Sequence, residues 1–191
     1  MAQVEVPDRL VALRSSLAWV VLGLVVVLAV SGVYLSLAYR PTAAAAWPQM
    51  GTGDGDRSFV QVVRSVHRWI AWGSLLPATA LAGVALAEAM ARWSGPTRRR
   101  VGALAGPVVV VAVVLGLGTG LFLPWDQLAL RAITVGTDYR GYDWLLGDDV
   151  RFVLRDGLEL SVTTVRAVFA VHVLAIPAVA AIALGALVRR R

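Results

Sequence analysis

The sequence predicts an all-α protein, a transmembrane four-helix bundle. Of its 191 residues, 58% are hydrophobic, and the mean hydropathy is +0.72, whereas about half of the residues in a soluble domain are apolar. Four separate stretches also provide the roughly 20 apolar residues that a helix needs to span a bilayer. We therefore expect lipid to surround the protein and residues 1–191 to form a single membrane domain.

The four expected helices lie in these apolar stretches, at about residues 16–39, 59–93, 101–123 and 163–188. Pro77 and Pro177 fall within the second and fourth helices, where a proline kinks a transmembrane helix without preventing it. The loop between the third and fourth helices, residues 125–161, carries seven acids against four arginines. We expect this loop to form one or two short interfacial helices.

Arginines indicate the orientation in the membrane. They concentrate in the link 92–100 and at residues 189–191, and loops rich in arginine stay in the cytoplasm. We therefore expect a multi-pass protein of the cytoplasmic membrane with both termini inside. The formal charge of +6 does not indicate a nucleic-acid partner, because the arginines lie at helix ends rather than in one patch. Near the inner face, Glu88 and Arg92 have the spacing of an i, i+4 ion pair.

The only two histidines, His67 and His172, both lie inside expected helices, where ionisable residues are costly and usually functional. Each lies about 12 Å along its helix from the outer end, and the two helices run in the same direction. Two facing imidazoles suit an iron with two axial ligands, whereas zinc needs three or four protein ligands. Because the chain has no cysteine, we predict one non-covalent haem b near the outer face.

Small residues at the same depth favour a flat cofactor there. Gly32 on the first helix and Gly116, Gly118 and Gly120 on the third leave room for a porphyrin, although a helical glycine costs about 1 kcal/mol relative to alanine. Arg64, one turn outward from the first histidine, could pair with a haem propionate. A plainer explanation stays open for each feature alone: a packing histidine, a Gly116–Gly120 helix contact, or an arginine that snorkels to the interface.

Four segments resemble one known family. The end of that family's first helix resembles SGVYLSLAYRP, and the start of its second resembles VVRSVHRW, in which Arg64 precedes the ligand His67. The family's Gly-x-x-Leu-Pro-Trp-x-Gln signature and the surface helix that follows it resemble GLFLPWDQLALRAITVG, and the start of its fourth helix resembles TTVRAVFAVHVLAIP, with His172 as ligand. The family is cytochrome b. The resemblance is to its N-terminal four-helix half, the haem-bearing part of quinol–cytochrome c reductases and their photosynthetic counterparts.

The resemblance implies that only one of the family's two haems is retained. The family has a second histidine fourteen residues after each ligand, and these positions are Leu81 and Ala186 in this chain. Ala18 stands where the inner haem would require a glycine, although Gly106 is kept. Arg166 lies beside the position of the family's arginine near the fourth-helix ligand and is the candidate partner of a propionate on that side.

These features predict a monohaem b-type cytochrome, an electron-transfer subunit of a larger respiratory oxidoreductase rather than a complete enzyme with catalytic residues. Quinone is the expected redox partner in the membrane, and other subunits of the complex dock outside, with residues 138–159 as a candidate acidic docking surface. One alternative is half of a split quinol oxidase, in which a separate subunit supplies the quinol-binding loop. Another is a haem-free membrane anchor or assembly subunit. A transporter is poorly supported, because no acid lies mid-membrane.

Overall fold

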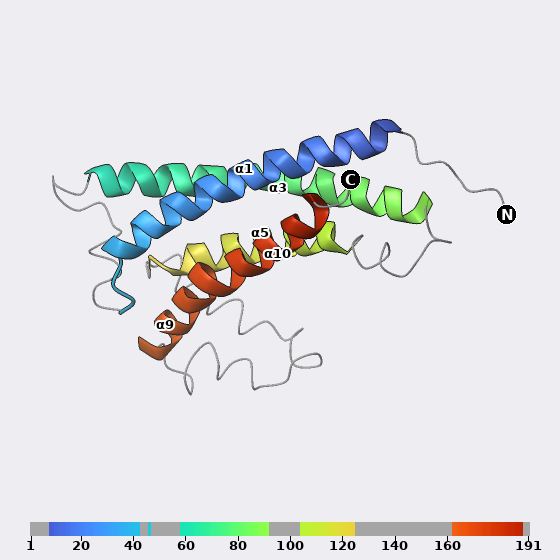
Figure 1. Ribbon diagram of the computed structural model, residues 1–191. Coiled ribbons are helices and arrows are strands. Elements are labelled where there is room, and N and C mark those ends of the chain that lie inside the picture. The colour runs from blue at the N-terminus through green and yellow to red at the C-terminus, as the bar shows by residue number, and fades with distance from the viewer. Residues whose placement is uncertain (1–7, 43–45, 47–57, 92–103, 125–161, 189–191) are drawn as a thin grey trace.

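The computed structural model describes residues 8–42, 46, 58–91, 104–124 and 162–188. The helices of this described part are α1 (Asp8–Ala38), α3 (Ser58–Ala91), α5 (Ala105–Phe122), α9 (Val162–Ala170), the π-helical turn η3 (Val171–Ala175) and α10 (Ile176–Val188) (Figure 1). Four spans are long and apolar enough to cross a membrane, the fourth being α9, η3 and α10 together. The predicted transmembrane four-helix bundle is therefore confirmed. The interfacial helices expected between residues 125 and 161 lie outside the described residues.

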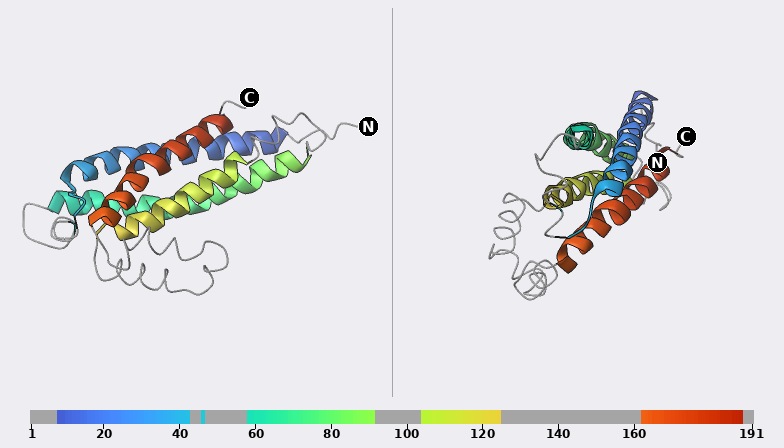
Figure 2. Two further views of the ribbon diagram at one scale, coloured as in Figure 1. Left: turned by 90° about the horizontal axis from the view of Figure 1, so that it is seen from below. Right: turned by 90° about the vertical axis from the view of Figure 1, so that its left-hand side faces the viewer.

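The four spans form a square in which each helix packs against two others. Helix α1 contacts α3 and α10, and α5 contacts the same two helices. Thus α1 and α5 lie on one diagonal of the square, and α3 and α10 lie on the other (Figure 2). Successive spans run in opposite directions (Figure 1). We call one end of the bundle, where α1 begins and α10 finishes, the Arg14 end. The opposite end, where α1 finishes and α9 begins, is the Tyr39 end.

Helix α1 begins at Asp8, before the apolar stretch that predicted its start near residue 16. Asp8 lies in the first turn, where a negative charge favours the amino-terminal end of a helix. Arg14 lies in the added segment and is 4% exposed. Apolar length alone does not reveal this extension, because its buried charge, Arg14, is compensated by groups on other helices of the bundle.

At the Arg14 end an ion pair connects two helices and reaches a third. Arg14 Nε lies 2.8 Å from Glu88 Oε2, with the two side chains 5% and 12% exposed. Arg14 also donates a hydrogen bond of 2.6 Å from Nη1 to the carbonyl oxygen of Leu187. Glu88 was expected to pair with Arg92, which lies outside the described residues. The pairing with Arg92 therefore stays a prediction. The structure shows a pairing of Glu88 across helices, which the i, i+4 rule does not consider.

An aliphatic core fills the half of the bundle next to the Arg14 end. Helices α3 and α5 are in close contact there, because a Cβ on Gly106 would lie only 2.8 Å from Ala82 Cα. Such close approach of backbones gives the van der Waals contact that holds helices together in lipid. The buried members of this cluster, here called the aliphatic core, are Ala18, Val21, Ala78, Leu81, Ala85, Ala105, Val109, Ala183, Leu184 and Leu187.

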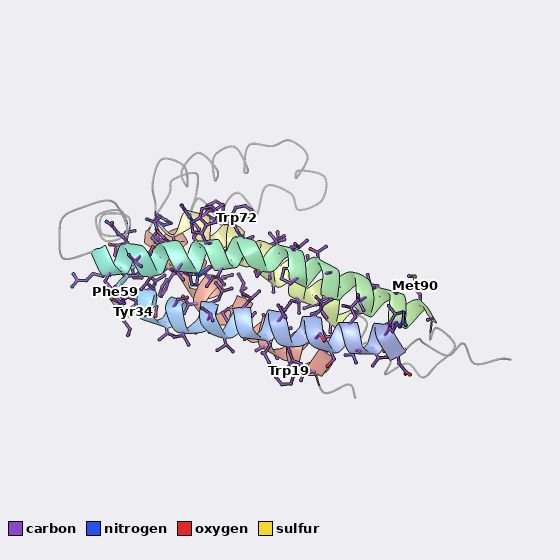
Figure 3. The ribbon with its side chains drawn as sticks, turned by 90° about the horizontal axis from the view of Figure 1, so that it is seen from above. Trp19, Tyr34, Phe59, Trp72 and Met90 are labelled. Carbon is purple, nitrogen blue, oxygen red and sulfur yellow. The ribbon has the colours of Figure 1, made fainter. Side chains whose placement is uncertain are left out.

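The Tyr39 end is joined by aromatic contacts. Tyr39 donates a hydrogen bond of 2.6 Å from its hydroxyl to the Leu123 carbonyl, and its ring stacks on Phe169 with centroids 5.2 Å apart. Burial raises the pKa of Tyr39 to about 12, so its hydroxyl keeps the proton that this bond requires. Tyr34 and Phe59 meet edge to face with centroids 5.5 Å apart, as Figure 3 shows at one end of the bundle.

We expect Glu88→Gln to lower the stability of the bundle in detergent by about 3 kcal/mol, because removing one partner of a buried ion pair leaves the other charge uncompensated. The measurement is the thermal unfolding temperature by circular dichroism, with Asp8→Asn, an exposed acid on α1, as the matched control. The double variant Arg14→Met with Glu88→Leu should recover much of the loss, because no buried charge remains. Equal melting of Glu88→Gln and the wild type would contradict this role of the pair.

Candidate functional site

The two histidines lie on the spans at opposite corners of the square, α3 and the span made of α9, η3 and α10. His67 lies in α3, and His172 lies in the π-helical turn η3. In this turn the backbone N–H of Ile176 donates to the Val171 carbonyl, five residues back. Pro177 follows directly, and a proline has no N–H to donate to the carbonyl four residues before it. The wider turn at this proline rotates the side chains that precede it, and π-helical turns often occur at functional sites.

The structure brings the two imidazole rings together across the bundle axis. Their centroids are 6.3 Å apart, and the ring planes are inclined at 59°. A nitrogen of imidazole bonds a metal at about 2 Å and lies about 1 Å from the ring centre, so two imidazoles on one ion have centres about 6 Å apart. The observed separation therefore fits two axial ligands of a single metal ion between the rings.

Two hydroxyl groups contact the Nδ1 atoms of these rings. Ser31 Oγ on α1 lies 2.8 Å from His67 Nδ1, and Thr119 Oγ1 on α5 lies 2.8 Å from His172 Nδ1. Sequence reasoning did not single out Ser31 or Thr119. The available signal was that each precedes a glycine of the expected site, as Ser31-Gly32 and Thr119-Gly120.

Two of the glycines predicted for the site contact the histidines. A Cβ on Gly32 would lie 3.4 Å from His67 Cε1, and a Cβ on Gly120 would lie 3.1 Å from His172 Cε1. Gly116 approaches Ile176 Cγ2 instead, at 3.6 Å, and a Cβ on Gly118 would meet no atom within 4 Å. Only two of these four glycines therefore provide close approach to the imidazoles. The distinction depends on which side of each helix faces the axis.

The histidines lie between two packed regions of the bundle. The aliphatic core fills the Arg14 side, and a small cluster around Tyr39 and Val165 closes the other side. Both histidine side chains are half-buried, whereas each of the two clusters contains fully buried side chains. Within the described residues, no group of three or more His, Cys, Asp or Glu side chains could hold a metal ion. The donor set therefore suits a metal that brings its own equatorial ligands, such as haem iron.

The two predicted arginines differ in their surroundings. Arg64 is half-buried on α3, one turn before His67 towards the Tyr39 end, whereas Arg166 is exposed on α9. Both lie on the same side of the histidines as the Tyr39 cluster. Their pairing with propionates stays a prediction.

Comparisons with known proteins identify the family of this chain. The family model described as Cytochrome b/b6/petB matches residues 6–189. The menaquinol:cytochrome c reductase cytochrome b subunit of Bacillus subtilis is 31% identical over 155 residues, which cover 80% of this chain and 67% of that protein. Cytochrome b6 of Heliobacterium mobile is 26% identical over 180 residues, covering 94% of this chain and 82% of that protein. Because the family model spans nearly the whole sequence, the chain belongs to the cytochrome b family.

Proposed function

We propose that this membrane cytochrome b carries a single non-covalent haem b, with His67 and His172 as the axial ligands of the iron. The observation that carries the proposal is the 6.3 Å separation of the two imidazole centres, which matches two ligands on one ion. The haem, when bound, supplies a one-electron carrier whose potential depends on axial ligands, hydrogen bonds and burial. The protein's own contribution is to hold both rings in place and to leave space beside them.

Support for one haem rather than two comes from the aliphatic core. A second haem would have to lie nearer the Arg14 end, where Leu81 and Leu184 are 0% exposed. Ala186, the other position at which the family has a ligand, is exposed and therefore does not face Leu81 across the bundle. Gly106 is kept, but the backbone of Ala82 already occupies the space beside it. The residues present at this level do not fit a porphyrin.

We infer the wider role from the family. The chain is an electron-transfer subunit of a membrane oxidoreductase complex, as the named reductase subunit of Bacillus subtilis suggests. We propose that the whole chain is one membrane domain and that the Arg14 end faces the cytoplasm. The haem would then lie towards the outer face, where Arg64 and Arg166 could meet its propionates. Electrons would pass between the quinone pool and a redox subunit docked outside.

The first test is a reduced-minus-oxidised spectrum with haem quantitation on the protein purified in detergent. We expect one haem b per chain, and loss of the haem in His67→Ala and in His172→Ala, because each variant removes one of the two axial ligands. Arg68→Ala, at an exposed position next to His67, should keep the haem. A colourless wild-type protein would instead support the haem-free anchor.

Steric access to the site can be tested with two glycines on α5. A leucine at Gly120 would press on the His172 ring, because even its Cβ would lie 3.1 Å from Cε1, whereas the matched position Gly118 has open space. We expect Gly120→Leu to lower the haem content by about 10-fold, the usual scale for disturbing the surroundings of a metal ligand. Gly118→Leu should keep the haem. Equal haem content in the two variants would show that close approach at Gly120 is not required.

A third test asks whether the aliphatic core leaves space for a second haem when two histidines are introduced there. The double variant Leu81→His with Ala186→His provides histidines at both positions of the family's second site. It should still contain one haem per chain, because the surrounding side chains and the Gly106–Ala82 contact leave no space for a porphyrin. Haem quantitation by pyridine haemochrome checks this. Two haems per chain would mean that ligands, rather than space, limit the number.

A further inference from the structure

The serine and threonine that contact the histidines form a repeated arrangement. On α1, Ser31 reaches His67 Nδ1, and the next residue is Gly32. On α5, Thr119 reaches His172 Nδ1 over the same distance of 2.8 Å, and the next residue is Gly120. Helices α1 and α5 occupy one diagonal of the square, and the histidines come from the other. Each ring is therefore held by a hydroxyl–glycine pair on a neighbouring helix.

Counting protons shows the direction of these hydrogen bonds. Ser31 Oγ lies 2.7 Å from the Val27 carbonyl oxygen, and Thr119 Oγ1 lies 2.7 Å from the Leu115 carbonyl oxygen. Two oxygens this close share a proton, and a carbonyl has none to give, so the hydroxyl proton points to the carbonyl. The hydroxyl oxygen then has only lone pairs to offer the imidazole. The proton in each 2.8 Å contact must come from Nδ1–H of the histidine.

This direction determines which nitrogen can bind a metal. A neutral imidazole carries one N–H, so a proton on Nδ1 leaves the lone pair on Nε2. In both rings the nitrogen that remains available is therefore Nε2. Metal-binding histidines usually donate their other N–H to an acceptor, which fixes the tautomer and the ring orientation and makes the ligand more basic.

We propose that Ser31 and Thr119 are positioning residues, which fix both histidines as Nε2 ligands and lower the reduction potential of the haem. This inference rests on the proposed haem site. A more basic imidazole stabilises the ferric state more than the ferrous state, so an acceptor at Nδ1–H favours oxidation. Removing the hydroxyl acceptor should therefore raise the potential. The backbone carbonyls of Leu28 and Gly116 also hydrogen-bond to His67 and His172, and they stay in place when Ser31 or Thr119 is changed, so the variants test the hydroxyls alone.

The experiment is a redox titration of the haem in Ser31→Ala and Thr119→Val, the second of which keeps the shape of the side chain but removes its hydroxyl. We expect the midpoint potential to shift in the positive direction in each, and further in the double variant. Thr119→Ser and Ser31→Thr restore a hydroxyl and should return the potential towards that of the wild type. A structural role alone would not produce this pattern of loss and rescue.

Matched controls come from two hydroxyls that bond only to carbonyls of their own helix. Ser36 donates to the Val33 carbonyl on α1, and Thr79 donates to the Leu75 carbonyl on α3. Ser36→Ala and Thr79→Val should leave the potential unchanged, although each removes the same kind of helix-bending bond. An equal shift in these controls would overturn the proposal.

The remaining outcomes are also decisive. Haem loss in Thr119→Val with retention in Thr119→Ser supports a positioning role, because serine keeps the hydroxyl of threonine and valine does not. An unchanged or more negative potential in both Ser31→Ala and Thr119→Val overturns it, even though the haem is present. Absence of haem from the wild-type protein would instead refute the proposed function itself, so the two failures are distinguishable.

Discussion

The meeting of two imidazoles across the bundle axis is the constraint on which the rest of the structure depends. Helices α3 and α10 lie on one diagonal of the square, and each is held by α1 and α5 rather than by the other. The histidines can approach to 6.3 Å between ring centres only where the diagonal space stays open. This requires small residues on α1 and α5 at that level, and Gly32 and Gly120 provide them. For this reason small residues, rather than bulky ones, lie beside the rings at the level between the two packed clusters.

The packing of the bundle changes along its length, from the aliphatic core to the level of the histidines. In the half next to the Arg14 end, small and branched aliphatic side chains bring the helices into direct contact, and Gly106 lets α5 approach the backbone of α3. Lipid competes for apolar contacts, so helices in a membrane associate through close packing rather than through exclusion of water. A gap left in this half would lose these contacts. Alanine, valine and leucine fill this half and keep the helices in direct contact.

Polar contacts then connect helices at the level of the histidines and at the two ends. Ser31 and Thr119 link α1 to α3 and α5 to η3 through the imidazoles. The Arg14–Glu88 ion pair joins α1 to α3 at one end, and Tyr39 joins α1 to the end of α5 at the other. Each of these groups satisfies a polar atom that would otherwise be costly in a low-dielectric environment. Their partners lie on different helices, so they set the relative rotation of the helices as well as their contact.

The sequence by itself determined the number of spans, the fold class and the two histidines, because long apolar stretches and rare polar residues are local features that survive without a structure. The resemblance to cytochrome b also placed Leu81 and Ala186 at the positions where that family has its second pair of histidines. Only the tertiary structure decided which glycines meet the rings, that Glu88 pairs with Arg14, and that Ser31 and Thr119 contact Nδ1 of each histidine. These features depend on helix rotation and on the π-helical turn before Pro177. A rotation is set by contacts between helices distant in sequence, which no local pattern encodes.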